Sequence, residues 1–208
     1  MFKRRNVLEA DKLVIVESSS SLWHLLNHEL MAVLENAADG KSGCSYAIES
    51  GRGVASSTAV SFLVAGSDGL AGLEGSEAYK KSMLEGGGGT YINQLLGLAL
   101  AKHAEVHGKA PKTIIFWSDF CDQDPNMEII REAAMVDLPD LKGTKICCAV
   151  DGRGGMIEYA QQWAEKLGVQ TGAQCEAVPF ESLKAQWEAD VLRAALPKRG
   201  RAKPNIRV

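Results

Sequence analysis

Continuous apolar runs alternate along this chain with stretches of helical periodicity. Residues 12–16, 113–117 and 145–150 are apolar throughout, apart from the first residue of each run. Runs without polar alternation are typical of strands that are buried on both faces of a parallel sheet. Leucines recur at helical spacing over 22–38, and a second helical pattern begins at residue 90. The pattern therefore predicts central strands separated by helices.

The first helix is predicted over residues 22–38 from its flanking residues as well as from its periodicity. Ser20 or Ser21 can serve as its N-cap, because a serine oxygen accepts a hydrogen bond from the first helical turn. Asp39 and Gly40 close it, since glycine readily takes the left-handed conformation that ends helices.

A hairpin and three further helices complete the predicted pattern. Residues 44–49 and 59–65 are β-rich, and the Gly/Ser-rich segment 50–57 between them favours a hairpin loop. The remaining predicted elements are helix 126–135, helix 156–167 ending at Gly168, a weak strand over 174–178 and helix 180–196. Strands and helices alternate through the second half, so the sequence predicts an α/β fold with a doubly wound, mostly parallel sheet and helices on both faces.

The composition fits one domain without a membrane-spanning or secretory segment. The chain has 208 residues, of which 46% are hydrophobic and 24% are charged, as in ordinary globular proteins. No apolar run approaches the roughly 18 residues that a membrane span requires. The N-terminal residues 1–5 include three basic side chains, but no apolar signal core follows them. We therefore predict a domain over residues 1–196 and a cytoplasmic location.

The last twelve residues differ in charge from the rest of the chain. Residues 197–208 contain five basic side chains and no acidic one, whereas the whole chain has a net charge of −3. We predict that this segment is a disordered, solvated tail. The alternative is an arm that contacts nucleic acid or an acidic partner.

Cysteines and histidines give no strong signal for metal binding or nucleophilic catalysis. The five cysteines include no C-x-x-C pair, so we expect buried free thiols. Cys147 and Cys148 are adjacent in a strand and should point to opposite faces of the sheet. Two histidine pairs have the i, i+4 spacing of helical metal ligands, but we interpret them as partly exposed structural positions. These pairs are His24 with His28 and His103 with His107.

Oxygen-bearing side chains follow the predicted strands at the edge where parallel sheets bind ligands. Acids and hydroxyls follow strand 12–16, a threonine follows the glycine run 86–89, and an aspartate follows strand 113–117. Two carboxylates and three hydroxyls are typical ligands of a hard cation such as Mg²⁺. The set consists of Glu17, Ser19, Ser21, Thr90 and Asp119. Taken singly, the serines and the threonine are equally well explained as helix caps, and the aspartate as part of an acidic turn.

In this arrangement the chain resembles the von Willebrand factor A (vWA) family. The metal-ion-dependent adhesion site (MIDAS) of that family has an Asp-x-Ser-x-Ser after the first strand, a threonine in a Gly-rich loop and an aspartate after the fourth strand. The matching segments here are Glu17-Ser18-Ser19-Ser20-Ser21, Gly88-Gly89-Thr90 and Trp117-Ser118-Asp119. The resemblance covers most of residues 10–180.

The resemblance implies a fold, a metal and a class of partner. It implies a doubly wound sheet with one antiparallel edge strand, and Mg²⁺ (alternatively Mn²⁺ or Ca²⁺) held by Glu17, Ser19, Ser21, Thr90 and Asp119. It further implies that the metal presents an open position to an acidic side chain of a partner protein. On this reading the chain is a protein-interaction module and not an enzyme.

Two other functions remain open, and a departure from the family motif motivates the first of them. The first aspartate of the motif is Glu17 here, which is longer by one methylene and changes how the carboxylate reaches a cation. A vWA scaffold that binds no metal is therefore one alternative. The other is a PIN- or NYN-like Mg²⁺-dependent nuclease with a cluster of carboxylates at strand ends. That cluster would consist of Glu17, Asp119, Asp122, Asp124 and Asp151.

Overall fold

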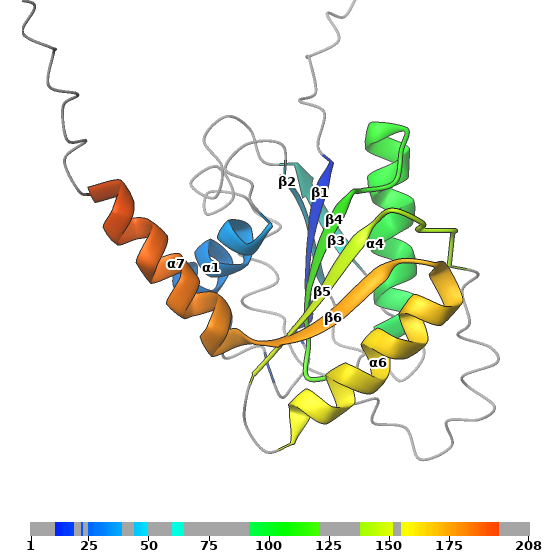
Figure 1. Ribbon diagram of the computed structural model, residues 1–208. Helices are drawn as coiled ribbons and strands as arrows, with labels where there is room; N and C mark the ends of the chain where they lie inside the picture. The colour runs from blue at the N-terminus through cyan, green and yellow to red at the C-terminus, as the bar shows by residue number, and fades with distance from the viewer. Residues whose placement is uncertain are drawn as a thin grey trace, which may run out of the picture.

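The computed structural model describes residues 11–18, 22, 25–38, 44–49, 60–64, 92–120, 138–151 and 155–195. These residues form one six-stranded sheet with the order β3-β2-β1-β4-β5-β6 (Figure 1). All neighbouring strands are parallel except β3, which pairs with β2 in the antiparallel direction. The strands are β1 (Lys12–Val16), β2 (Cys44–Glu49), β3 (Val60–Val64), β4 (Thr113–Trp117), β5 (Lys145–Val150) and β6 (Gln174–Pro179).

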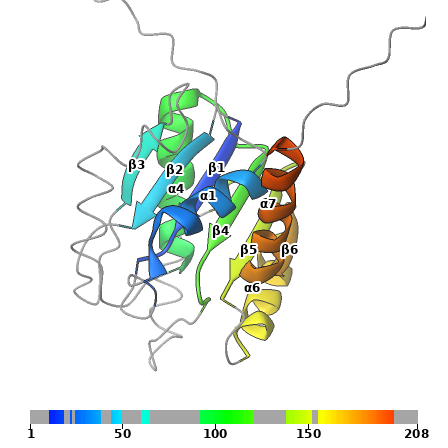
Figure 2. The ribbon, with the colours of Figure 1, turned by 90° about the vertical axis from the view of Figure 1, so that its left-hand side faces the viewer.

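Helices cover both faces of this sheet, which confirms the predicted α/β class and doubly wound architecture. Figure 2 looks onto the face that α1 and α7 cover, with α4 behind the sheet. The helices are α1 (His28–Ala37), α4 (Ile92–His107), α6 (Met156–Thr171) and α7 (Phe180–Ala195).

Each central strand contributes side chains to two separate hydrophobic clusters. In β1, Leu13 and Ile15 pack on the α4/α6 side, whereas Val14 and Val16 pack on the α1/α7 side. All four are fully buried. This double burial is the physical reason why β1 reads as a continuous apolar run.

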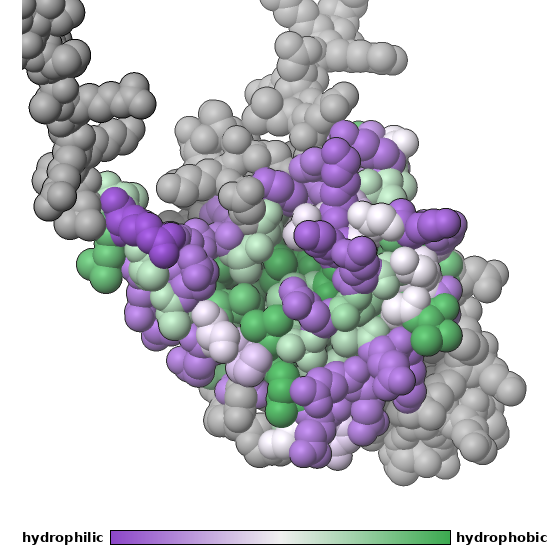
Figure 3. Space-filling model, in the orientation of Figure 1, coloured by the Kyte–Doolittle hydropathy of each residue, from purple (hydrophilic) through white to green (hydrophobic). Residues whose placement is uncertain are grey.

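Helix α7 is the least buried of the four helices. No residue of α7 is buried, and Leu192 near its end is 68% exposed. A pocket of about 350 Å³ lies between α1, α7 and the strands β4 to β6, and Cys147, Val178 and Leu183 form part of its wall. Figure 3 shows apolar surface beside the polar outer face of α7.

The first helix is shorter than the sequence predicts. α1 begins at His28, with Asn27 as its N-cap, and the Asn27 side chain accepts a hydrogen bond from Leu30 N–H (2.8 Å). The prediction of a helix from residue 22 with a serine cap was wrong. Leu22 and Leu26 are nevertheless buried, at 2% and 4% exposure. Their burial reproduces the apolar spacing of a helix at described positions that precede the start of α1.

Helix α6 extends beyond the end that Gly168 predicts. It continues to Thr171, and Gly172, with a φ of 71°, ends it by donating its N–H to the Gly168 carbonyl (3.0 Å). A Cβ atom on Gly168 would lie 3.4 Å from the carbonyl oxygen of Ala173. Gly168 is therefore an interior helix residue next to the chain that leaves α6, and Gly172 is the residue that ends the helix.

The cysteine prediction is confirmed for Cys44, Cys147, Cys148 and Cys175, which are free and at least partly buried. Cys147 packs in the cluster on the α1/α7 side and Cys148 in the opposite one, as adjacent strand residues should. Burial raises the pKa of the Cys44 and Cys147 thiols to about 12, so they are protonated at neutral pH. Cys121 lies outside the described residues.

The histidines differ from the sequence-based interpretation. His28 is exposed as expected, but His103 is fully buried rather than partly exposed. Its ring contacts those of Phe62 and His107, with ring centroids 6.3 and 4.6 Å apart. His24 lies outside the described residues, as do the predicted hairpin loop 50–57, the predicted helix 126–135 and the tail 197–208. Within the described part of the chain, no helix is long and apolar enough to span a membrane.

Candidate functional site

The carboxyl ends of β1 and β4 meet at the topological switch point of the sheet. The chain runs from β1 to β2 on one side of β1, while β4 pairs with β1 on the other side. Val16 lies opposite Trp117 in the register, and Glu17 N–H donates a hydrogen bond to the Trp117 carbonyl (3.1 Å). Open α/β sheets bind ligands in the crevice at such a point. The register therefore brings the predicted site residues Glu17 and Asp119 to neighbouring strand ends.

Ser118 connects these two strand ends through its hydroxyl group. Its Oγ donates a hydrogen bond to Glu17 Oε2 and accepts one from Phe120 N–H (2.8 Å). Glu17 is 2% exposed and Ser118 is fully buried. A buried carboxylate requires hydrogen bonds or a cation to offset its lost hydration. The bond from Ser118 meets part of that requirement and fixes the orientation of the Glu17 carboxylate.

The chain turns sharply just after Asp119. Phe120 has a φ of 54°, in the left-handed region that a bulky residue rarely adopts. Its ring is buried and packs edge-on against Phe116, with the centroids 5.4 Å apart. Burial of this ring stabilises an unfavourable backbone conformation of the kind that clusters at functional sites. The turn leaves Asp119 directly at the end of β4, with 5% exposure.

Glu49 is a further buried acid at this edge, and the sequence analysis missed it. It ends β2 and is 5% exposed. Its Oε2 accepts a hydrogen bond from Ser18 N–H (3.0 Å), and its carbonyl accepts one from Ser18 Oγ (2.8 Å). These bonds tie the ends of β1 and β2 together and fix the chain that leaves Glu17. An acid at the end of an apolar strand is a weak signal for such a role, because the pairing partner depends on strand order.

Two of the five predicted metal ligands, Glu17 and Asp119, lie in the described part of the chain. The hydroxyl ligands and part of the nuclease cluster do not. The predicted residues outside the described ranges are Ser19, Ser21, Thr90, Asp122 and Asp124.

Asp151 follows β5 at the same edge, but its carboxylate lines a separate pocket on the α1/α7 side. Across the described ranges, no three histidine, cysteine, aspartate or glutamate side chains form a group that could hold a metal. The carboxylates of Glu49, Glu17, Asp119 and Asp151 are therefore spread along successive strand ends.

The donor chemistry of the described residues fits a hard cation. Carboxylate oxygens from Glu17 and Asp119 and the hydroxyl of Ser118 are all hard oxygen donors. Mg²⁺ typically takes one or two protein carboxylates and completes its octahedron with water or ligand oxygens. A site built on these two acids therefore matches Mg²⁺ in donor type and in number of carboxylates.

Comparison with known proteins adds no family assignment. No protein-family model matches the chain, and no curated protein is significantly similar to it.

Proposed function

We propose that this chain is a protein-interaction module of the vWA type that binds Mg²⁺ at the carboxyl ends of β1 and β4. In this proposal Glu17 and Asp119 supply the carboxylates, and Ser19, Ser21 and Thr90 supply the hydroxyl ligands. The observation that carries it is the burial of Glu17 and Asp119 on either side of the switch point. Two acids buried at neighbouring strand ends create a negative potential that a divalent cation offsets.

Ser118 supports a role for Glu17 in spite of its extra methylene. The longer side chain reaches the hydroxyl of Ser118 on the neighbouring strand end. This bond restricts a carboxylate that would otherwise have more rotational freedom than the aspartate of the family motif. In the proposal, Ser118 is a positioning residue that holds Glu17 for the metal or for a water bound to it.

The partner in this proposal is a protein that offers an acidic side chain to the open metal position. A cytoplasmic location and an interaction within a larger assembly belong to the same proposal. The basic segment 197–208 would add a second contact, to an acidic surface or to nucleic acid.

The direct test is calorimetric titration of Mg²⁺ and Mn²⁺ into the native protein and into Asp119→Asn. The expected result is binding to the native protein that weakens by more than about tenfold in the variant. Asp140→Asn is the matched control, because Asp140 is exposed and precedes β5, at the opposite edge of the sheet. Asparagine keeps the carbonyl oxygen that accepts the hydrogen bond from Lys142 N–H. Equal binding by native protein and Asp119→Asn would reject the proposed site.

Two additions to this titration separate the alternative functions. With Mn²⁺ bound, acetate should displace coordinated water and lower the proton relaxation rate if an open position accepts acidic groups. Mn²⁺-dependent cleavage of single-stranded RNA or DNA that Asp119→Asn abolishes would instead favour the nuclease hypothesis. Absence of metal binding to the native protein would leave the metal-free scaffold.

A further inference from the structure

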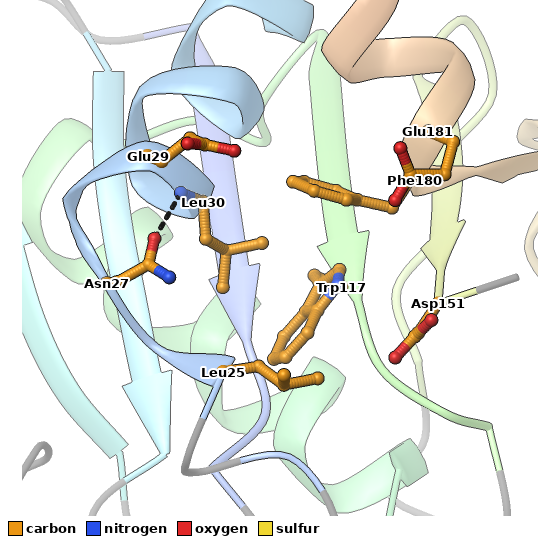
Figure 4. Close-up of a pocket in the computed structure, with 8 residues that line it drawn as sticks. All are labelled: Leu25, Asn27, Glu29, Leu30, Trp117, Asp151, Phe180 and Glu181. Atoms are coloured by element: carbon orange, nitrogen blue, oxygen red, sulfur yellow. Dashed lines mark hydrogen bonds between the residues drawn. The ribbon is translucent and has the colours of Figure 1, made fainter. Parts of the chain in front are cut away.

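A pocket separate from the Glu17–Asp119 site lies beside Trp117, between the first turns of α1 and α7. It has a volume of about 160 Å³ and is formed by these two helix starts and by the ends of β4 and β5 (Figure 4). Its wall comes from the α1/α7 face of the sheet, because Trp117 belongs to the hydrophobic cluster of that face. The pocket shares none of its described lining residues with the Glu17–Asp119 site.

The indole of Trp117 provides the most specific feature of this pocket. Trp117 is 1% exposed, and its Nε1–H has no hydrogen-bond acceptor among the described residues. In Figure 4 the nitrogen lies on the edge of the ring that faces Phe180 and Asp151, while the six-membered ring points toward Leu25. A buried indole N–H usually has a partner. An acceptor atom on a ligand would satisfy it.

Acidic side chains give the pocket a negative potential. Glu29, Asp151 and Glu181 line it, and no lysine, arginine or histidine is among the described lining residues. Glu29 forms an ion pair with Lys184 across the α1/α7 contact. Among the described lining residues and their printed ion pair, carboxylates outnumber basic groups, and this negative charge attracts a cation into the pocket.

The apolar and aromatic walls of the pocket favour an organic cation over a metal ion. Phe180 and Trp117 present rings to the pocket, and Leu30 presents its isobutyl group (Figure 4). Aromatic faces attract ammonium groups through their quadrupole, and quaternary ammonium ligands are recognised in this way. A hydrated metal ion would leave these walls unused.

The volume limits the size of the ligand. A cavity of about 150 Å³ holds one benzene molecule, so this pocket admits a ligand of about six to eight non-hydrogen atoms. We propose that the pocket binds a small organic ammonium ion that also carries a hydrogen-bond-accepting oxygen, as amino alcohols do. The ammonium group lies against Phe180 and the carboxylates, and the oxygen accepts the hydrogen bond from Trp117 Nε1–H. This proposal does not depend on metal binding at the other site.

Three probes of similar size separate the two recognition elements on the native protein. Choline carries both the cation and the oxygen, tetramethylammonium carries only the cation, and 3,3-dimethylbutan-1-ol carries only the oxygen. The readout is the indole N–H resonance of Trp117 in a ¹⁵N–¹H correlation spectrum, assigned by its loss in Trp117→Phe. Choline is expected to shift this resonance and to bind more tightly than either other probe. Binding of the neutral alcohol as tight as that of choline, or no shift with any probe, would overturn the proposal.

Variants then test the residues. Trp117→Phe keeps an aromatic ring but removes the N–H, and it should weaken choline binding by about fivefold and tetramethylammonium binding by less. Asp151→Asn should weaken both cations, whereas Glu165→Gln, an equal charge change on the exposed side of α6, should weaken neither. Equal losses in Asp151→Asn and Glu165→Gln would show non-specific attraction and contradict the proposal. Asp119→Asn, which tests the metal site, should leave choline binding unchanged.

Discussion

The two faces of the central sheet are packed in different ways. On the α4/α6 side, α4 buries Leu95, Leu96 and Ala99 completely, and α6 buries a further stripe of side chains. On the α1/α7 side, α1 buries side chains such as Met31 and Leu34, but α7 buries no residue, and the two pockets described above lie between α7, α1 and the sheet. Both faces therefore contain a buried core, but the part of the α1/α7 face that α7 covers is lightly packed and offers space to a ligand.

This difference separates the residues that should affect folding from those that should affect binding. A tightly packed region leaves no room for a ligand, and a change of side-chain volume in it lowers the free energy of unfolding. A lightly packed helix can lose a side chain at small cost. Stability measurements on matched variants of the two faces will show whether the division is real.

The largest effect is expected from truncating a leucine of α4. Leu96→Ala should lower the free energy of unfolding by about 3 kcal/mol, since it removes a fully buried side chain and leaves a cavity. Leu183→Ala in α7 should cost only about 1 kcal/mol, because Leu183 is half-buried against the opposite cluster. Urea unfolding followed by circular dichroism measures both. Equal losses would show that the faces do not differ in packing.

A pH-dependent weakness is expected within the tightly packed face, at His103. Burial lowers the pKa of His103 to about 4, with further lowering by His107 and Lys109, while Asp11 acts in the opposite direction. Because the folded-state pKa lies below the value of an unfolded histidine, acid favours unfolding. Full stability is present above pH 6.5 and is lost as the pH falls toward 4. Between pH 7.5 and pH 5 this loss amounts to about 2 kcal/mol.

Urea unfolding at pH 7.5 and pH 5 tests the effect in the native protein and in His103→Leu. The variant should lose the part of the pH dependence that comes from this imidazole. His28→Gln, which removes an exposed histidine, is the control for the loss of an imidazole as such. An unchanged pH dependence in His103→Leu would mean that other groups control acid stability.

The sheet could be predicted from sequence because its signal is local. The apolar runs of β1, β4 and β5 mark strands covered on both faces, and the structure confirms each of them within the described residues. The start of α1 could not be predicted in the same way. Leu22 and Leu26 are buried by tertiary packing and thereby continue the helical spacing beyond the helix. The spacing of these two leucines therefore reflects their burial and not helix formation.

The candidate site could be predicted only in part, for a different physical reason. Glu17 directly follows β1 and Asp119 comes two residues after β4, so their place at the sheet edge is a local property. The contacts of Glu17 with Ser118 and of Glu49 with Ser18 depend on which strands are neighbours. Strand order is not encoded in any single segment. For the same reason the unpartnered N–H of Trp117 could be found only from the packing around it.

A smaller effect is expected at the start of α1, on the α1/α7 face. Asn27→Ala removes the side-chain oxygen that accepts the hydrogen bond from Leu30 N–H and should cost about 1 kcal/mol. Asn27→Asp keeps the cap and adds a charge that the helix N-terminus favours, so its stability should remain close to that of the native protein. Urea unfolding of both variants measures the difference. A cost that is equal in both would assign the loss to the pocket wall and not to the cap.

The smallest effect is expected from the ion pair that joins α7 to α1. Lys184→Gln removes the partner of Glu29, but both side chains are partly exposed, so the thermal unfolding midpoint should fall only slightly. The difference from the native protein should shrink at high salt, because salt screens exposed charges. The same variant makes the nearby pocket more negative and should therefore tighten choline binding while it weakens the α1/α7 contact. A large loss of stability would instead show that α7 depends on this ion pair for its position. The attachment of α7 would then rest on charge, whereas α4 and α6 are attached by the packing of buried side chains.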